Sequence, residues 1–196
     1  MFRTSWVLGF HGCDRAVGER VLAGEHLQLS RNDYDWLGEG IYFWENDPLR
    51  AYHWALFIQQ HPQFFKTRID KPFVVGAIID PGSCLDLSDQ SSLTTLQRAY
   101  EVFREIRKME GGELPENKSG FEGDADLIKR HLDCAVINFM HYFRQEEGLE
   151  PYTTVRGPFM EGEPLYPGAK IMAKTHVQIT VRDPVAIRGY FRVAEL

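Results

Sequence analysis

Alternating and continuous runs of apolar residues predict the strands of this chain. Trp6, Leu8 and Phe10 alternate with smaller or polar residues, the pattern of a strand whose two faces differ. Residues 41–44 are an aromatic run that reads as a short strand. Further strands are expected at residues 27–29, 73–79, 171–181 and 185–193.

Apolar residues three and four positions apart predict helices between these strands. Each helix follows a residue suited to an N-cap, and Pro48 suits the first turn of the second helix. The expected caps and extents are Asp14 with a helix through Leu22, Asp47 with residues 48–60, Ser92 with residues 93–106, and Asp124 with residues 128–143. The last two helices are expected to pair as a hairpin. The proline-rich residues 148–168 are expected to form an ordered loop.

The composition is that of an ordinary globular domain. The chain has 196 residues, 43% hydrophobic and 26% charged, with no repeat or linker, so one domain over residues 1–196 is expected. The net charge of −6 argues against broad electrostatic capture of nucleic acid, although a local basic groove is compatible with it. Three cysteines without a C-x-x-C spacing fit reduced thiols. Neither a membrane-spanning run nor a secretory signal is recognisable, so a cytoplasmic protein without a membrane partner is expected.

Two glycine-containing stretches predict a small-molecule site between two strands. His11 and Gly12 lie at the end of the first strand, where a glycine permits close approach to the backbone. Gly38 and Gly40 precede the aromatic strand, whose rings would lie beside a gap. Each stretch also has a simpler interpretation, since a strand-end histidine is often only hydrogen-bonded and aromatic runs are more often core. Their joint order along the chain favours a site.

This order of residues resembles the ADP-ribosyltransferase superfamily, in the branch of the poly(ADP-ribose) polymerases and diphtheria toxin. The residues that carry the resemblance are His11-Gly12, then Gly38-x-Gly40-Ile41-Tyr42-Phe43, then Gln178 in a late strand. The signature of that branch is a His-Tyr-Glu triad on three strands, which corresponds here to His11, Tyr42 and Gln178. The resemblance implies an α+β fold. Its sheet would be mixed, split and mainly antiparallel, with peripheral helices and NAD in the cleft between the halves.

The resemblance also implies how the histidine and glycine act on NAD, the expected co-substrate. His11 would hydrogen-bond a ribose hydroxyl, and the backbone of Gly12 would bind the nicotinamide carboxamide. No metal is expected. The helical spacing of His131, Cys134 and His141 is compatible with zinc, but it reads more readily as ordinary core.

Aromatic residues are expected to hold the nicotinamide ring. Tyr42 would pack against the ring, and Phe43 beside it belongs to the same expected cofactor-binding set. The second ring of the sandwich would be His53, with Tyr52 next to it as the other choice. Ser30, in the polar loop before the glycines, is also expected to reach the cofactor.

Gln178 departs from the family pattern, because the triad normally ends in a glutamate. A carboxylate offsets positive charge that develops on the sugar, whereas an amide can only hydrogen-bond. Three explanations remain open: Glu161 or Glu163 supplies the carboxylate, the enzyme is slower, or the site binds NAD without transfer. Polymer synthesis is not expected, and the resemblance implies a mono-ADP-ribosyltransferase.

The chain is similar to small bacterial toxins of toxin–antitoxin and phage-defence systems, because no regulatory helical domain accompanies it. The resemblance implies a macromolecular acceptor (RNA, DNA or protein) and an antitoxin partner. The segment that would contact the acceptor carries Arg156, Phe159, Met160 and Tyr166, a charge and stacking set that slightly favours nucleic acid, such as RNA. The alternatives are an NAD glycohydrolase and a non-catalytic NAD- or protein-binding module.

Overall fold

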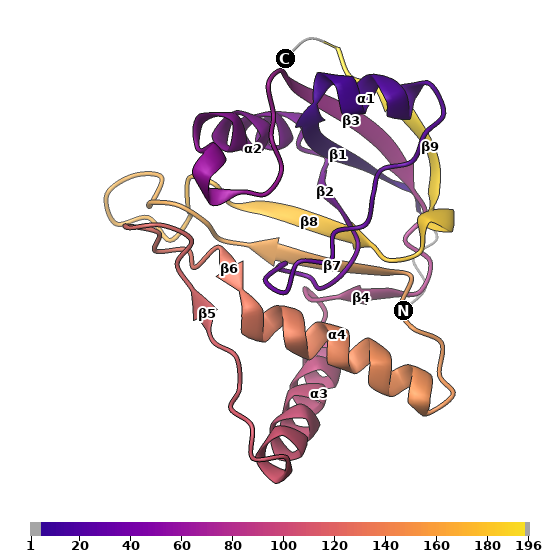
Figure 1. Ribbon diagram of the computed structural model, residues 1–196, viewed down its shortest axis with the longest axis vertical. Helices are drawn as coiled ribbons and strands as arrows, with labels where there is room; N and C mark the ends of the chain where they lie inside the picture. The colour runs from indigo at the N-terminus through magenta and orange to yellow at the C-terminus, as the bar shows by residue number, and fades with distance from the viewer. Residues whose placement is uncertain (1–4, 195–196) are drawn as a thin grey trace.

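The computed structural model describes residues 5–194, which form a seven-stranded mixed sheet flanked by helices (Figure 1). The strand order is β4-β7-β8-β2-β1-β3-β9. β4 and β7 run parallel, whereas the neighbouring pairs from β7 to β9 are antiparallel. The predicted α+β class with a mainly antiparallel mixed sheet is therefore confirmed.

The strands and helices have the following bounds in chain order. The strands are β1 (Val7–Asp14), β2 (Ile41–Glu45), β3 (Pro72–Ile79), β4 (Cys84–Asp86), β7 (Thr154–Phe159), β8 (His176–Val181) and β9 (Ile187–Arg192). A separate two-stranded ladder joins β5 (Asn117–Lys118) to β6 (Lys129–Arg130). The helices are α1 (Arg15–Leu22), α2 (Pro48–Gln60), α3 (Gln90–Met109) and α4 (His131–Glu146), with 3-10 turns at Pro62–Phe64 and Pro184–Ala186.

The sheet opens between β1 and β2. β1 pairs with β3 along its whole length, from Val7 to Asp14. Its pairing with β2 is confined to Gly9 opposite Glu45 and Phe10 opposite Trp44. The two strands therefore diverge beyond Phe10, which leaves one edge of β1 without a neighbouring strand.

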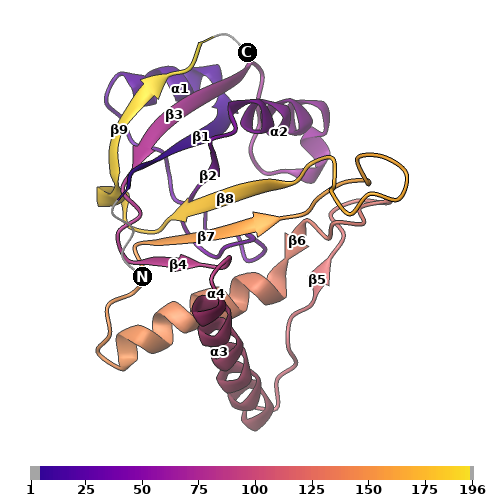
Figure 2. The same cartoon turned by 180° about the vertical axis from the view of Figure 1, so that it is seen from behind.

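Helices pack on both faces of the sheet and form separate cores. α1 covers the face that carries Phe43 and Val75, and α2 covers the face that carries Phe10 and Trp44. α3 packs against α4, whose Ile137 lies with residues of β4 and β7 in another core. Figures 1 and 2 show α1 and α2 near the β3–β9 end of the sheet and α3 and α4 near its β4 end. Within residues 5–194, the helices are too short or too polar to cross a membrane.

Local signals placed the first half of the fold well. Asp14 accepts a hydrogen bond from the Ala16 N–H at the start of α1, and Asp47 accepts one from the Arg50 N–H at the start of α2, as predicted.

The expected strand at residues 27–29 is wrong. That segment runs as irregular chain to Ser30, whose backbone bridges that of Gly40.

Two predicted caps in the second half are wrong. α3 begins before Ser92 and is capped by Asp89, which accepts from the Ser91 N–H. Asp124 starts no helix: its carboxylate accepts from three backbone N–H groups of a loop, those of Gly120, Asp126 and Ile128, and α4 begins only at His131. Aspartate often caps a helix, but the aspartate at position 124 stabilises a loop instead.

The expected loop at residues 148–168 contains a strand, β7, which the prolines concealed. Pro158 lies beyond the segment of β7 that pairs with β4, so its missing N–H removes no bond to that strand. The expected strand at residues 171–181 is shorter than predicted and begins at His176. The preceding residues instead fold back on the 161–165 segment, where Lys174 N–H donates to Glu161 O and Ala173 N–H donates to Glu163 O.

Candidate functional site

The opening between β1 and β2 exposes a peptide edge at Gly12. The Asn46 N–H donates to Leu8 O at 2.9 Å, so the peptide groups of Leu8, Phe10 and Gly12 face β2. Pairing with β2 ends at Phe10, and the N–H and C=O of Gly12 therefore point into the opening. A Cβ at Gly12 would overlap the carbonyl oxygen of Ala51 in α2, so only glycine fits between the sheet and this helix.

His11 fills the start of the opening with its side chain. Its Nδ1 lies 2.8 Å from the carbonyl oxygen of Tyr42. A carbonyl only accepts hydrogen bonds, so Nδ1 carries the proton and Nε2 is left as an acceptor. Burial lowers the pKa of His11, which keeps the ring neutral at neutral pH. His11 can therefore accept a hydrogen bond from a hydroxyl group of a ligand.

A cavity of about 520 Å³ lies along this opening. The sequence-predicted residues that line it are His11, Gly12, Ser30, Tyr42 and Gln178. Cavities of a few hundred Å³ with mixed apolar and polar walls are typical of small-molecule sites. The structure thus brings the three proposed triad positions, on β1, β2 and β8, to one cavity.

Tyr42 is held by the glycine segment before it. Its hydroxyl donates to Gly38 O at 2.5 Å and accepts from the Leu37 N–H at 2.8 Å. Burial raises the pKa of Tyr42 well above its usual value, so the phenol is neutral. Gly38 and Gly40 both have positive φ, and a Cβ on Gly40 would press on Thr180 and Val181 of β8. The glycine motif therefore positions the tyrosine ring.

Gln178 lies across β2 from the opening. It pairs with Trp44, and Thr180 pairs with Tyr42, so all four side chains share one face of the sheet. Gln178 and Tyr42 are diagonal neighbours on that face. The half-buried amide of Gln178 therefore lies beside the tyrosine ring in the cavity wall.

Three predicted cofactor contacts do not line the cavity. Phe43 is fully buried in the core on the other face of β2, where it touches His11 edge-on. Tyr52 packs beside Phe10 and Trp44, and His53 is exposed to solvent on α2. The aromatic ring that α2 contributes to the cavity is Trp54.

The helical spacing explains why Trp54 lines the cavity and His53 does not. Arg50, Trp54 and Ile58 recur at intervals of four residues, form one stripe along α2, and all line the cavity. His53 lies one residue before Trp54, and one residue turns a helix by about 100°, so the two side chains leave α2 in different directions. The i, i+4 stripe is the signal in the sequence that points to Trp54.

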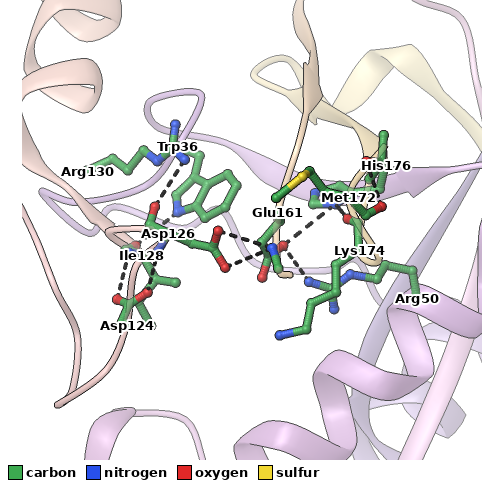
Figure 3. Close-up of polar contacts among 12 residues, drawn as sticks. Trp36, Arg50, Asp124, Asp126, Ile128, Arg130, Glu161, Met172, Lys174 and His176 are labelled. Atoms are coloured by element: carbon green, nitrogen blue, oxygen red, sulfur yellow. Dashed lines mark hydrogen bonds and ion pairs between the residues drawn. The ribbon is translucent and has the colours of Figure 1, made fainter. Parts of the chain in front are cut away.

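The sequence predicted only one member of a buried ion pair in the cavity wall. Arg50 Nη2 and Glu161 Oε2 lie 2.6 Å apart, with side chains 12% and 7% exposed. Glu161 follows β7, Arg50 lies in the first turn of α2, and Figure 3 shows the two groups facing one another. Arg50 carries no recognisable motif in the sequence, whereas Glu161 was one of two open choices. Glu163, the other choice, is exposed and is absent from the cavity lining.

The residues expected to contact an acceptor are only partly available. Arg156 forms ion pairs with Glu45 at 2.6 Å and Asp86 at 3.2 Å, and its side chain is 14% exposed. Phe159 packs edge-on against Trp36, with ring centroids 4.7 Å apart. Met160 and Tyr166 remain exposed. The positive charge of Arg156, which favoured a nucleic-acid acceptor, is therefore already paired with carboxylates of the fold.

The histidine and cysteine stripe of α4 is engaged in other contacts. His131 lies beside Asp33, Cys134 Sγ lies 3.4 Å from Asn32 O, and His141 Nδ1 lies 2.7 Å from Ile137 O. In the part of the chain from residue 5 to residue 194, histidine, cysteine and carboxylate side chains form no group of three that would hold a metal ion.

Comparisons with known proteins give one short match. No family model and no solved structure matches this chain. Uncharacterized protein MJ0359 of Methanocaldococcus jannaschii is 30% identical over 66 residues, which are 34% of this chain. The matched segment spans only 28% of the archaeal protein. This similarity assigns neither a family nor an activity, and the function must be inferred from the cavity.

Proposed function

We propose that this protein is an NAD-dependent mono-ADP-ribosyltransferase with the split sheet of that superfamily. The observation that carries the proposal is the Gly12 peptide, which lies in the opening beyond the last β1–β2 pair and is flanked by the neutral His11 ring and the Tyr42 ring in one cavity. A nicotinamide carboxamide has one donor group and one acceptor group, which match the C=O and N–H of a peptide edge. His11 Nε2 would accept from a ribose hydroxyl.

The aromatic walls support a flat, cationic ring as the ligand. Tyr42 lines one side of the opening, and Trp44 and Trp54 lie near it, with their ring centroids 6.1 Å apart. The face of an aromatic ring carries negative partial charge, which favours a pyridinium over a neutral ring. Trp54 from α2 is the second ring of the nicotinamide sandwich in this proposal.

The acceptor in the proposed reaction is a macromolecule. The segment after β7, which contributes Glu161 to the cavity lining, also presents exposed apolar residues, among them Met160 and Tyr166. With Arg156 tied to Glu45, these surfaces suit a protein as well as an RNA base. A role as a cytoplasmic toxin with an antitoxin partner remains part of the proposal.

Purified protein should release nicotinamide from NAD, and His11→Ala should lower that rate about 100-fold by disordering the ribose. The measurement uses NAD labelled on nicotinamide and, separately, on adenine, with RNA, DNA or cell protein added. Adenine label in one macromolecular fraction would establish transfer and name the acceptor class. Release without such label would establish an NAD glycohydrolase. NAD binding without nicotinamide release would indicate a non-catalytic binding module. A protein that shows no NAD binding and no nicotinamide release would refute the proposal.

Trp54→Leu should weaken NAD binding about 10-fold, because a stacked ring contributes on the order of 1–3 kcal/mol. His53→Ala, one residue earlier on α2 and exposed, should change affinity less than about 2-fold. Calorimetric titration with NAD measures both dissociation constants, and thermal melts check that each variant is folded. Equal effects at the two positions would contradict the assignment of Trp54.

A further inference from the structure

Glu161 is a buried carboxylate with one oxygen available in the cavity. The residue is 6% exposed and lines the same cavity as His11, Tyr42 and Gln178. Oε2 accepts the short hydrogen bond from Arg50. Among the residues that the structure describes, none donates a hydrogen bond to Oε1, and this oxygen is not one of the fully buried polar atoms.

The backbone around Glu161 is held by two segments of the chain. Its carbonyl oxygen accepts from the Lys174 N–H at 2.9 Å. The next residue, Gly162, donates its N–H to both carboxylate oxygens of Asp126, each at 3.1 Å. Asp126 lies in the loop that the buried carboxylate of Asp124 shapes (Figure 3). The position of Glu161 therefore depends on the loop before α4 as well as on β7.

Two basic side chains lie beside Glu161, and both approach Oε2. Arg50 is the arginine that pairs with it, and burial lowers the pKa of the neighbouring His176, which leaves that ring neutral at neutral pH. His176 Nδ1 donates instead to Lys174 O at 2.7 Å. Buried ion pairs contribute little net stability, so their retention in a cavity wall is a reason to look for a functional role.

We propose that Glu161 is the catalytic carboxylate of the reaction. It would replace the triad glutamate, whose position Gln178 occupies in this chain. This inference rests on the proposed function. Gln178 orients the ribose by hydrogen bonding, and Glu161 supplies the negative charge and the base. The two roles that one glutamate holds in the superfamily are thereby divided between β8 and the segment after β7.

Glu161 acts as the general base in the proposed reaction. The bond between ribose C1′ and the nicotinamide nitrogen breaks, and its electron pair leaves with nicotinamide as a neutral ring. The ribose carries the positive charge as an oxocarbenium ion, which the Glu161 carboxylate stabilises. An O–H or N–H group of the acceptor then forms the new bond to C1′. Its proton passes to Glu161 and from there to solvent.

Asp35 is a competing carboxylate in the cavity lining. It also lines the cavity, and its Oδ2 is buried without a hydrogen-bond partner. Burial raises the pKa of Asp35, and its other oxygen is contacted by Asn32 at 3.3 Å. The structure pairs Asp35 with neither arginine nor lysine side chains of residues 5–194, whereas Glu161 has Arg50. The buried arginine partner distinguishes Glu161 from Asp35 and favours it as the catalytic carboxylate.

The test compares nicotinamide release by wild type, Glu161→Gln, Glu161→Ala, Asp35→Asn and Glu163→Gln. Glu161→Gln should lower the rate about 100-fold or more while the dissociation constant for NAD changes less than about 3-fold. Asp35→Asn and the exposed control Glu163→Gln should each stay within about 5-fold of wild type. Added formate should restore activity to Glu161→Ala, because a small carboxylate can occupy the vacated space, and it should not restore His11→Ala.

The outcomes separate the two proposals. A wild type that releases no nicotinamide overturns the proposed function itself. An active wild type with an equally active Glu161→Gln overturns only the role of Glu161, as does a rate that falls in Asp35→Asn instead. If Glu161→Gln is slow because Arg50 is left unpaired and the protein loosens, its dissociation constant for NAD will rise together with the loss of rate, and a purely structural role is then established.

Discussion

Gly12→Ala should destabilise the protein by about 3 kcal/mol and abolish NAD binding. The new Cβ would overlap the carbonyl oxygen of Ala51 and approach the Ala55 side chain. Both belong to the buried face of α2, which cannot yield by rotating a side chain. The helix must move away from β1, and that movement displaces Trp54 and Arg50 from the cavity wall. Urea unfolding gives the stability change, and calorimetric titration gives the NAD affinity.

Gly189→Ala in β9 is the matched control. The added Cβ there meets no atom within 4 Å, and the strand remains paired with β3. Removing a glycine from a strand should leave stability unchanged or raise it by up to about 1 kcal/mol. A Gly12→Ala protein as stable as Gly189→Ala, with normal NAD affinity, would show that the contact between α2 and β1 is loose. The proposal that the peptide group of Gly12 binds the nicotinamide carboxamide would then lose its support.

Arg156→Met should lower the free energy of unfolding by about 3–5 kcal/mol. Arg156 bridges Glu45 on β2 and Asp86 on β4, whose side chains are only 10% and 11% exposed. Methionine keeps much of the side-chain volume but leaves the Glu45 carboxylate buried without its guanidinium group. The large expected loss reflects that uncompensated charge and not the net contribution of the pair.

Arg192→Met provides the exposed comparison. Arg192 also contacts both oxygens of a carboxylate, that of Glu19, but these side chains are 55% and 42% exposed. Solvent screens such a pair, so its loss should lower the free energy of unfolding far less than the loss of Arg156 does. Chemical denaturation of the two variants under identical conditions measures the difference. Similar losses would mean that the Arg156 cluster is well hydrated and free to serve an acceptor, as the sequence first indicated.

Local sequence patterns were sufficient for the elements that build the opening. Asp14 and the Asp47-Pro48 pair stop strands and start helices through contacts within a few residues, and such contacts are readable in sequence. The alternation in β1 and the aromatic run of β2 placed His11 and Tyr42 on strands. Ser30, Gly12 and Gln178 were predicted beside them and do line the same cavity.

Predictions failed where a distant partner decides the conformation. Asp124 has the form of a helix cap, but the loop amides that it binds make it the centre of a turn. β7 exists because β4 and β8 lie on either side of it, despite the local proline. Tyr52 and His53 lie outside the cavity lining, because the packing of α2 on the sheet turns Trp54 towards the cavity.

The sequence by itself determined the α+β class, the first two strand–helix units and the histidine, glycine and tyrosine of the candidate site. Only the tertiary structure decided which side chains complete that site. It buried Phe43, tied Arg156 to Glu45, and brought Arg50 of α2 against Glu161 from a segment 111 residues away. The reason is physical: caps and periodic patterns act over one or two turns of chain. The pairing of buried charges is selected by the low-dielectric surroundings that only the folded chain creates.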